Sequence, residues 1–266
     1  MQKTILLTGA TDGIGLETGK LLVGAGHHVL LHGRNPAKLA AAEKEVAGQG
    51  TVETFLCDLS DLADVERFAA TVAERHEKLD VLINNAGILK TPEPITAEGL
   101  DVRFVVNTLA PYLLTRKVLP LMGPQGRVVN LSSAAQAPVS LEALAGPAGR
   151  LSDMEAYAQS KLAITQWSRH LAQELDRAGP AVIAVNPGSL LASKMVKEGF
   201  GIAGNDLSIG AEILIRAALS EDFAAASGRY YDNDSKAFAD PHPDGLDAGK
   251  AAALVRTMEA VLGDKL

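Results

Sequence analysis

The chain has 266 residues, 47% of them hydrophobic, so it can form one large α/β domain or two small ones. Its net charge of -7 and isoelectric point near 5.4 argue against a nucleic-acid-binding protein, because the 25 Lys and Arg residues are scattered. A single cysteine, Cys57, excludes an intramolecular disulfide, and no apolar run is long enough for a signal peptide or a membrane span, so we expect a cytoplasmic protein.

Apolar runs typical of buried strands alternate along the chain with segments of helical periodicity. The predicted strands are 3–8, 28–32, 52–57, 79–84, 126–132, 181–186 and 229–231. The predicted helices are 13–25, 36–47, 62–75, 100–121, 155–177, 208–219 and 248–262. Because no stretch resembles a linker, we predict one doubly wound α/β domain over 1–266, with a parallel sheet of about seven strands and helices on both faces.

Three segments depart from this alternation. Residues 134–154 have little periodicity and contain several prolines and glycines, which indicates an excursion from the fold. Residues 189–207 contain three glycines that would let the segment move as a substrate lid. Residues 232–266 form a C-terminal extension, in which a polar loop over 232–247 precedes the last helix.

Glycine and polar clusters follow the predicted strands where each strand ends. They are Gly9–Gly15, Gly33–Asn35, Asp58, Asn84–Gly87, Ser132–Ser133 and Pro187–Ser189. A doubly wound sheet binds its ligand at the carboxyl ends of its strands. We therefore expect these clusters to border one site.

The first cluster has the composition of a phosphate-binding loop. Its glycines permit a tight turn and the close approach of a pyrophosphate to the N-terminus of the following helix. The residues predicted to bind a dinucleotide are Gly9, Thr11, Asp12, Gly13, Ile14 and Gly15. A glycine-rich turn without a ligand is the alternative, whereas a P-loop is disfavoured because no Lys-Ser/Thr pair follows Gly15.

The end of the second strand indicates which dinucleotide binds. An NAD site usually offers a carboxylate there, whereas this chain has Gly33 followed by Arg34 and Asn35. A guanidinium matches a 2′-phosphate, so we predict NADP(H) in preference to NAD(H). A solvated turn residue is the alternative for Arg34.

Tyr157 and Lys161 are four residues apart, so a helix would place both on one face. A cation beside a phenol favours the phenolate, which predicts a lowered pKa for Tyr157 and a role as proton donor or acceptor. Taken alone, the pair could also be ordinary helix residues.

With these pieces in order, the chain resembles the short-chain dehydrogenase/reductase family, whose fold is a Rossmann-type sheet. The matching motifs are Thr8–Gly15, Cys57-Asp58-Leu59, Asn84-Asn85-Ala86-Gly87, Asn107, Asn130–Ser133, Tyr157–Lys161 and Asn186-Pro187-Gly188. The resemblance implies a catalytic tetrad of Asn107, Ser133, Tyr157 and Lys161. It also implies that Asp58 and Leu59 lie near the adenine, that Asn85, Ala86 and Gly87 flank the adenosine half, and that Pro187, Gly188 and Ser189 lie near the nicotinamide, with Tyr157 and Lys161 also contacting the cofactor.

The implied chemistry is a hydride transfer to or from a carbonyl carbon. Tyr157 would donate the proton, Ser133 would hydrogen-bond the same oxygen, Lys161 would bond the nicotinamide ribose, and Asn107 would position a water. Other readings stay open for these residues. Residue chemistry alone does not decide between Ser132 and Ser133, and Asn107 could brace a kink. Asn84 and Asn85 could cap a strand end, and Asp58 could belong to a helix N-cap region.

Ser133 and Tyr157 are 24 residues apart, a longer interval than is usual in the family, and one that resembles retinol-dehydrogenase-like and protochlorophyllide-reductase-like members. That resemblance implies an apolar or bulky substrate. Leu141, Leu144 and Leu151 could line its pocket or pack the excursion onto the core. In the family, a threonine shortly after the Pro-Gly pair often contacts the nicotinamide amide. In this chain the nearest hydroxyl, that of Ser193, lies one residue further along than that threonine.

We therefore predict an NADP(H)-dependent oxidoreductase acting on a small-molecule carbonyl or alcohol. The alternative is a non-catalytic dinucleotide-binding regulatory protein on the same fold. No metal site is expected, because the six histidines are dispersed and no metal-binding motif is complete. The helices from Leu100 and from Glu155 are the usual dimer-forming pair in the family, so we expect a homodimer or homotetramer unless the excursion obstructs them.

Overall fold

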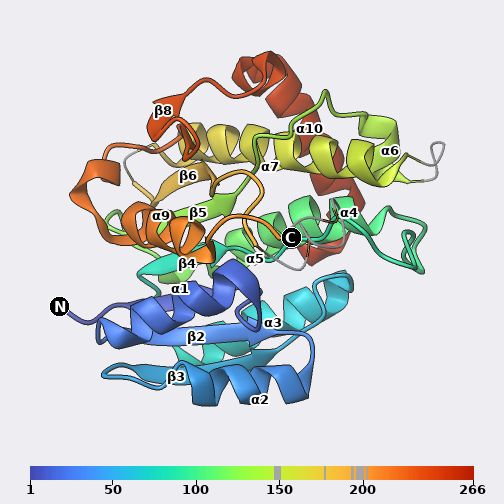
Figure 1. The fold of residues 1–266 in the computed structure, drawn as a ribbon. Helices are drawn as coiled ribbons and strands as arrows, with labels where there is room; N and C mark the ends of the chain where they lie inside the picture. Colours follow the sequence, from blue (N-terminus) through green and yellow to red (C-terminus); the bar gives the residue numbers. More distant parts are fainter. Residues whose placement is uncertain (147–150, 177, 193–194, 196–200, 202) are drawn as a thin grey trace.

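A computed structural model describes residues 1–146, 151–176, 178–192, 195, 201 and 203–266 (Figure 1). Within these residues, eight strands form one sheet in the order β3-β2-β1-β4-β5-β6-β7-β8. Neighbouring strands from β3 to β7 are parallel. The strands are β1 Thr4–Leu7, β2 His28–Gly33, β3 Thr51–Leu56, β4 Val81–Asn84, β5 Arg127–Leu131, β6 Ala181–Asn186, β7 Tyr230–Asp232 and β8 Ala237–Ala239. The predicted single-domain, doubly wound α/β fold is confirmed.

The sheet has one strand more than the predicted number. β8 pairs antiparallel with β7 and lies inside the segment predicted to be a polar loop, 232–247. Its only large apolar side chain, Phe238, packs on Phe223 and Tyr231 with ring centroids 5.1 Å from each. A three-residue edge strand with one inward side chain has too short a pattern to be predicted from periodicity.

Helices cover both faces of the sheet because successive strand residues point to opposite sides. Ile5 and Leu7 of β1 pack in one core cluster, and Leu6 between them packs in the other. The first cluster lies under α1 Gly13–Gly24, α2 Pro36–Glu45 and α9 Leu207–Leu219. The second lies under α3 Leu62–Arg75, α5 Ala110–Val118 and α7 Asp153–Leu175. Short 3-10 turns occur at Leu119–Leu121, Glu221–Phe223, Pro243–Leu246 and Gly263–Lys265.

The major helices begin at residues whose side chains accept a hydrogen bond from the first turn, which satisfies backbone N–H groups that have no partner within the helix. The capping residues are Asp12, Asn35, Asp61, Ser152, Asp206 and Asp247. At α7 the cap is a full capping box between Ser152 and Glu155, and the helix begins two residues earlier than predicted.

The helix predicted over 100–121 is divided. α4 Val102–Phe104 passes into a π-helical turn, η1 Val105–Leu109, and only then into α5. Pro111 explains the change, because it has no N–H to donate to the carbonyl of Asn107 four residues earlier. The Ala110 N–H bonds the Val105 carbonyl, five residues back. Asn107 therefore lies at a bulge rather than in a regular helix.

The excursion over 134–154 packs onto the core. It contains a short helix, α6 Leu141–Ala145, in which Leu144 is fully buried. Leu141 and Leu151 are partly buried against the same core cluster. Of the two alternatives for these leucines, the structure supports packing rather than pocket lining. Residues 147–150 lie outside the described part of the chain.

The last helix, α10 Ala248–Leu262, lies against α7 (Figure 1) and buries Leu254, Val255, Met258 and Leu262. Glu259 on α10 accepts a hydrogen bond of 2.9 Å from the Tyr112 hydroxyl on α5, and Tyr112 packs edge-on against Trp167 of α7. α10 therefore covers part of the helix pair on which we expected a dimer to form.

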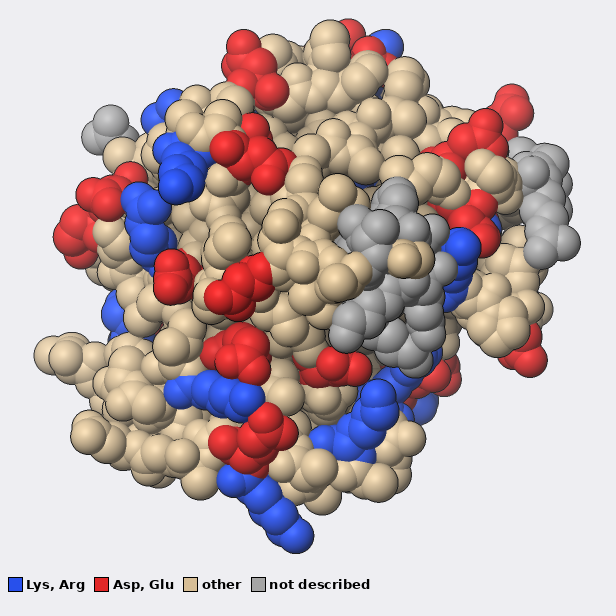
Figure 2. Space-filling model, in the orientation of Figure 1, with Lys and Arg blue, Asp and Glu red and all other residues tan. Residues whose placement is uncertain are grey.

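Acidic and basic side chains are interspersed on the face shown in Figure 2. No helix in the described ranges is long and apolar enough to cross a membrane.

Replacing Met258 by alanine should lower the free energy of unfolding by about 2–5 kcal/mol, because the side chain is fully buried between α10 and the core. Arg256→Ala, on the exposed side of the same helix, should change it by less than about 0.5 kcal/mol. Urea unfolding of both variants measures the difference, and equal losses would contradict the assigned packing.

Candidate active site

The glycine loop lies against the end of β4. Gly9 has φ +66°, and a Cβ placed on Gly15 would lie 2.1 Å from the Gly9 carbonyl oxygen and 2.4 Å from Asn85 Nδ2. Asn85 Nδ2 donates to the carbonyls of Thr8 at 2.9 Å and Gly9 at 3.0 Å. No side chain fits at either glycine, so backbone amides border the start of α1. This cradle fits a pyrophosphate.

The remaining loop residues have defined local roles. Asp12 Oδ1 accepts from the Gly13 N–H at 2.8 Å and so caps α1. Thr8 Oγ1 accepts from the N–H groups of Asn85 at 3.0 Å and Ala86 at 3.1 Å. Asn85 and Ala86 therefore brace the loop after β1.

Thr11 explains the glycine at the end of β2. A Cβ on Gly33 would lie 2.4 Å from Thr11 Cγ2, so a carboxylate side chain at position 33 would require Thr11 to move. Arg34 is exposed and forms no ion pair with any residue the structure describes, whereas Asn35 caps α2 through the Lys38 N–H at 3.0 Å. Arg34 is thus available to an anion at this corner.

A buried histidine that the sequence reasoning missed supports the same loop. His32 Nδ1 accepts from the Gly9 N–H at 3.1 Å, and its Nε2 lies 3.0 Å from the Cys57 carbonyl oxygen. The ring stacks on Phe68, with centroids 5.1 Å apart. Burial lowers the pKa of His32 to about 4. The one indication of this role in the sequence was the position of the histidine near the end of β2, between two of the strand-end clusters predicted to bind the cofactor.

Asp58 and Leu59 already contact other residues of the protein. Asp58 Oδ1 accepts from the N–H of Ser60 at 2.9 Å and from its hydroxyl at 2.7 Å, while Asp61 is the cap of α3. Leu59 is buried in the core cluster beneath α3. Their contact with an adenine stays a prediction.

The two serines after β5 have different surroundings. Ser132 Oγ is buried, 2.9 Å from the Lys161 carbonyl oxygen and 2.7 Å from Thr165 Oγ1. The Ser133 side chain lies close enough to Tyr157 to act on the pKa of the phenol, which it lowers. The structure therefore distinguishes the pair and brings Ser133, the predicted residue, to the tyrosine.

Lys161 extends from α7 to the strand end. Its Nζ donates to the Leu131 carbonyl at 2.7 Å and lies 5.6 Å from the centroid of the Tyr157 ring. Burial lowers the pKa of Lys161 to about 8. Gly87 lies beside it, since a Cβ there would be in ordinary contact with Lys161 Nζ at 3.4 Å and with Met195 Cε at 3.9 Å.

The expected direction of the Tyr157 pKa is corrected. The pKa is raised above its ordinary value because burial disfavours the phenolate, and the neighbouring Ser133 side chain only partly opposes this. The Lys161 ammonium is directed at a carbonyl rather than at the phenol oxygen. Desolvation, which cannot be read from the spacing of two residues, outweighs the attraction that the sequence suggested.

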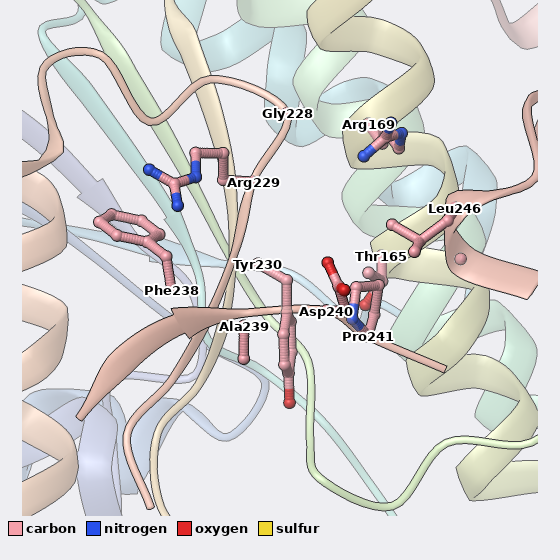
Figure 3. A pocket seen from close by; sticks show the side chains of 11 residues that line it. Thr165, Arg169, Gly228, Arg229, Tyr230, Phe238, Ala239, Asp240, Pro241 and Leu246 are labelled. Carbon is pink, nitrogen blue, oxygen red and sulfur yellow. The ribbon is translucent and has the colours of Figure 1, made fainter. Parts of the chain in front are cut away.

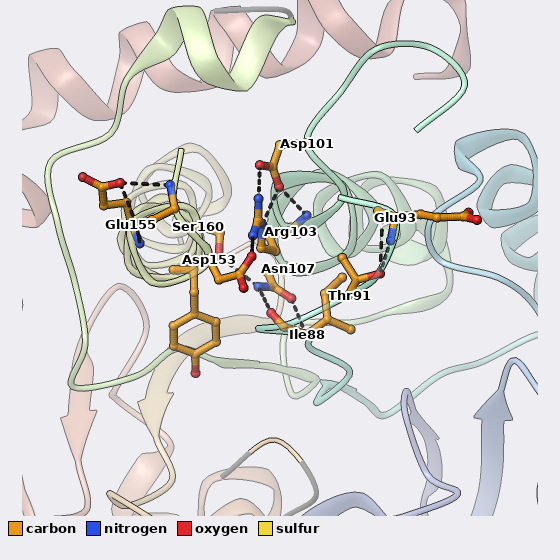
Figure 4. Close-up of polar contacts among 11 residues, drawn as sticks. Ile88, Thr91, Glu93, Asp101, Arg103, Asn107, Asp153, Glu155 and Ser160 are labelled. Atoms are coloured by element: carbon orange, nitrogen blue, oxygen red, sulfur yellow. Dashed lines mark hydrogen bonds and ion pairs between the residues drawn. The ribbon is translucent and has the colours of Figure 1, made fainter. Parts of the chain in front are cut away.

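Asn107 has all its side-chain groups bonded within the protein (Figure 4). Oδ1 accepts from the Ile88 N–H at 2.8 Å, and Nδ2 donates to the Ile88 carbonyl and to Ser160 Oγ, both at 2.9 Å. The residue thus joins the loop after β4 to α7. The structure therefore contains both the helical kink at Asn107 and the bracing of that kink by its side chain, which the sequence left open.

The Pro187–Ser189 turn is held by residues that the sequence reasoning did not identify. Asp234 accepts from the Ser189 N–H at 2.8 Å and from its hydroxyl at 2.5 Å. Asn233 Nδ2 donates to the Pro187 carbonyl at 2.9 Å. Gly188, with φ +122°, permits the turn. Ser189 therefore bonds the β7–β8 turn, and its contact with a cofactor stays a prediction; Ser193 lies outside the described residues.

A cavity of about 380 Å³ lies between α7 and the β7–β8 hairpin (Figure 3). Arg229 stacks on Phe238 at its border, 4.0 Å from the ring centroid, and the Tyr230 hydroxyl donates to the Ser133 carbonyl at 3.1 Å. The cavity is lined by none of the predicted site residues. Among the residues that the structure describes, no group of His, Cys, Asp and Glu could hold a metal ion.

The strand-end clusters thus meet at one edge of the sheet, with a glycine cradle at one end and a serine, a tyrosine and a buried lysine at the other. This combination defines a dinucleotide-binding oxidoreductase. The family model for short chain dehydrogenase matches residues 3–200, and the chain belongs to this family, as the sequence motifs indicated.

Relatives support the assignment. The chain is 32% identical over 253 residues to human retinol dehydrogenase 13, covering 86% of this chain and 76% of the relative. It is 32% identical over 257 residues to human polyprenol dehydrogenase, covering 88% and 78%. Among solved structures, an uncharacterized protein from Mycobacterium paratuberculosis matches with a TM-score of 0.84 and 31% identity, covering 98% of this chain and 93% of that one. The predicted retinol-dehydrogenase-like character is confirmed.

His32 should make stability depend on pH. Its folded pKa of about 4 lies below its usual 6.5, so its contribution is complete above pH 6.5 and is lost as the pH falls toward 4, by up to about 3 kcal/mol. His32→Asn keeps an acceptor for Gly9 but cannot be protonated. Urea unfolding at pH 7.5 and 5.0 should show a smaller pH dependence in the variant, and equal dependence would contradict this role.

Proposed function

We propose that the chain is an NADP(H)-dependent oxidoreductase that transfers a hydride between the nicotinamide and a carbonyl or alcohol substrate. The observation that carries the proposal is the placement of Ser133 and of the buried Lys161 ammonium beside Tyr157, with Lys161 Nζ 5.6 Å from the centroid of the tyrosine ring. A non-catalytic regulator would have no chemical need for this arrangement. Nothing in the described site favours that alternative.

The cofactor supplies or accepts the hydride when bound. The glycine loop, with Thr11, Asp12 and Ile14, would hold its pyrophosphate, and Lys161 would hold the nicotinamide ribose. Asn85, Ala86, Gly87, Pro187 and Gly188 border the same edge of the sheet.

Tyr157 is the group that exchanges a proton with the substrate oxygen. Because burial raises its pKa, the hydroxyl stays protonated near neutral pH and is ready to donate as negative charge develops on that oxygen. The Ser133 hydroxyl stabilises the same charge. In alcohol oxidation the tyrosine acts as the base.

Proton supply to Tyr157 would pass along α7. The pKa of about 8 at Lys161 means that its ammonium can both hold and release a proton near neutral pH. The side chain of Asn107 is fully bonded, so its backbone carbonyl, which Pro111 cannot bond, is the better candidate to hold a water.

The preference for NADP(H) is supported by Gly33 and Arg34. A carboxylate at position 33, which would repel a 2′-phosphate, would require Thr11 to move, and the exposed guanidinium of Arg34 offers paired donors.

An apolar or bulky substrate is supported by exposed apolar side chains in segments next to the tetrad. Met154 precedes Tyr157 by three residues and is 42% exposed, and Leu190 follows Ser189 and is 43% exposed. Two relatives carry the names of retinol and polyprenol, which are long apolar alcohols. Met195, in the segment predicted to be a lid, also lies beside Gly87 at this site.

The wider assignments remain predictions. They are a cytoplasmic location, no nucleic-acid partner and a homodimer or homotetramer. An assembly through α5 and α7 would have to accommodate α10, which already packs there.

Tyr157→Phe should reduce kcat by at least about 100-fold, because the variant has no proton to exchange, while NADPH binding changes little. The measurement is NADPH absorbance with a panel of aldehydes, ketones and long-chain alcohols, beside NADPH fluorescence for binding. Unchanged turnover in this variant would refute the mechanism. Cofactor binding without turnover of any substrate by the native protein would favour the non-catalytic regulator.

Arg34→Ala should lower the preference for NADPH over NADH in kcat/KM by about 10- to 100-fold, since a charge-assisted pair with the 2′-phosphate is lost. Lys44→Ala, at the far end of α2, is the matched control and should leave the ratio unchanged. An unaltered ratio in Arg34→Ala would show that another group selects the cofactor.

A further inference from the structure

A buried arginine joins the two helices that carry Asn107 and Tyr157 (Figure 4). Arg103 on α4 has a side chain only 1% exposed. Its Nε and Nη2 donate to the two carboxylate oxygens of Asp101, at 2.8 and 2.6 Å, and its Nη1 donates to Asp153. Asp153 is the first residue of α7.

The ion pair lies four residues before each of two functional residues. Arg103 precedes Asn107 on the α4–η1 segment, and Asp153 precedes Tyr157 on α7. The same two segments are joined again where Asn107 bonds Ser160 Oγ and Thr108 bonds the Ser160 carbonyl at 3.0 Å. Tyr157 therefore lies between two polar connections to one neighbouring segment.

Charge balance alone does not require Asp153. The bidentate bond to Asp101, whose side chain is itself only 9% exposed, already pairs the Arg103 guanidinium. The Asp153 side chain is 45% exposed and would be hydrated without the arginine. Its bond to Arg103 is therefore best explained by what it does to α7.

The first turn of α7 has few other attachments. Among the described residues, and apart from regular helical hydrogen bonds, the other polar contacts of residues 152–156 lie within that turn, between Ser152 and Glu155 and between Ala156 and Ser152. Helix ends fray more readily than helix centres, and here the capping box and the buried Ala156 are what else opposes fraying. Fraying here would move Tyr157, which lies in the next turn.

We propose that Arg103 and Asp153 are positioning residues, which hold the first turn of α7 against α4 and thereby place the Tyr157 hydroxyl for proton transfer. This inference rests on the proposed function. It differs from a general contribution to stability, because the effect falls on the chemical step and not on cofactor binding.

The chain provides a matched control at the other end of the same helices. Arg116 on α5 pairs with Glu174 on α7 at 2.8 Å, far along the helix from Tyr157. Asp153→Asn and Glu174→Gln each remove one carboxylate charge from an α7 ion pair. Arg103 stays paired with Asp101 in the first variant, so neither protein is expected to unfold.

Asp153→Asn should lower kcat by about 5- to 20-fold and leave the KM for NADPH within about twofold of the native value, since displacing a reacting group is costly only in the transition state. Glu174→Gln should leave both within about twofold. Amide exchange over 153–160 should be faster in Asp153→Asn and unchanged in Glu174→Gln.

Equal kcat and equal amide exchange in the native protein and Asp153→Asn would overturn the inference. Matching losses in Glu174→Gln, or parallel losses of kcat and NADPH affinity in Asp153→Asn, would overturn it in favour of a purely structural ion pair. If the native protein turns over no substrate, the proposed function fails, and the exchange measurement alone then decides whether Asp153 holds the first turn of α7.

Discussion

The site depends on how closely the glycine loop after β1 approaches the end of β4. The sheet order reverses between these strands, and at such a point the loops diverge and leave a crevice. Asn85 bonds two carbonyls of the loop there, and Gly15 has space for a hydrogen only. His32 supports the same loop from β2. The phosphate cradle is thus built from backbone atoms held on three sides.

The catalytic half depends on desolvation. Tyr157 and Lys161 share a poorly hydrated environment in which each charged form is disfavoured, so the phenol keeps its proton and the ammonium holds its own less tightly. Such an arrangement suits a group that must donate a proton only when charge develops next to it. The surrounding bonds of Asn107, Ser132 and Ser160 fix the backbone of α7 without placing another charge beside the phenol.

The sequence predicted most of the fold because its strands are continuous apolar runs and its helices have clear periodicity. The structure also places the glycine loop and the other clusters at strand ends, with Ser132 buried against α7 and Ser133 near Tyr157, whereas the roles of these residues stay predictions. Features that depend on contacts between distant segments were missed: β8, the brace of Ser189 by Asp234, and the bonds of His32. The helical bulge at Asn107 depends on a missing N–H at Pro111, and the Tyr157 pKa depends on burial, which residue spacing does not reveal.

The position of α10 has a consequence for how the protein behaves on dilution. A helix supplied by a second molecule would leave the surface of α5 and α7 when the protein concentration fell, whereas α10 is attached to the same chain and remains at a high effective concentration. The apolar surface around Tyr112 and Trp167 therefore stays covered by α10 when the protein is diluted.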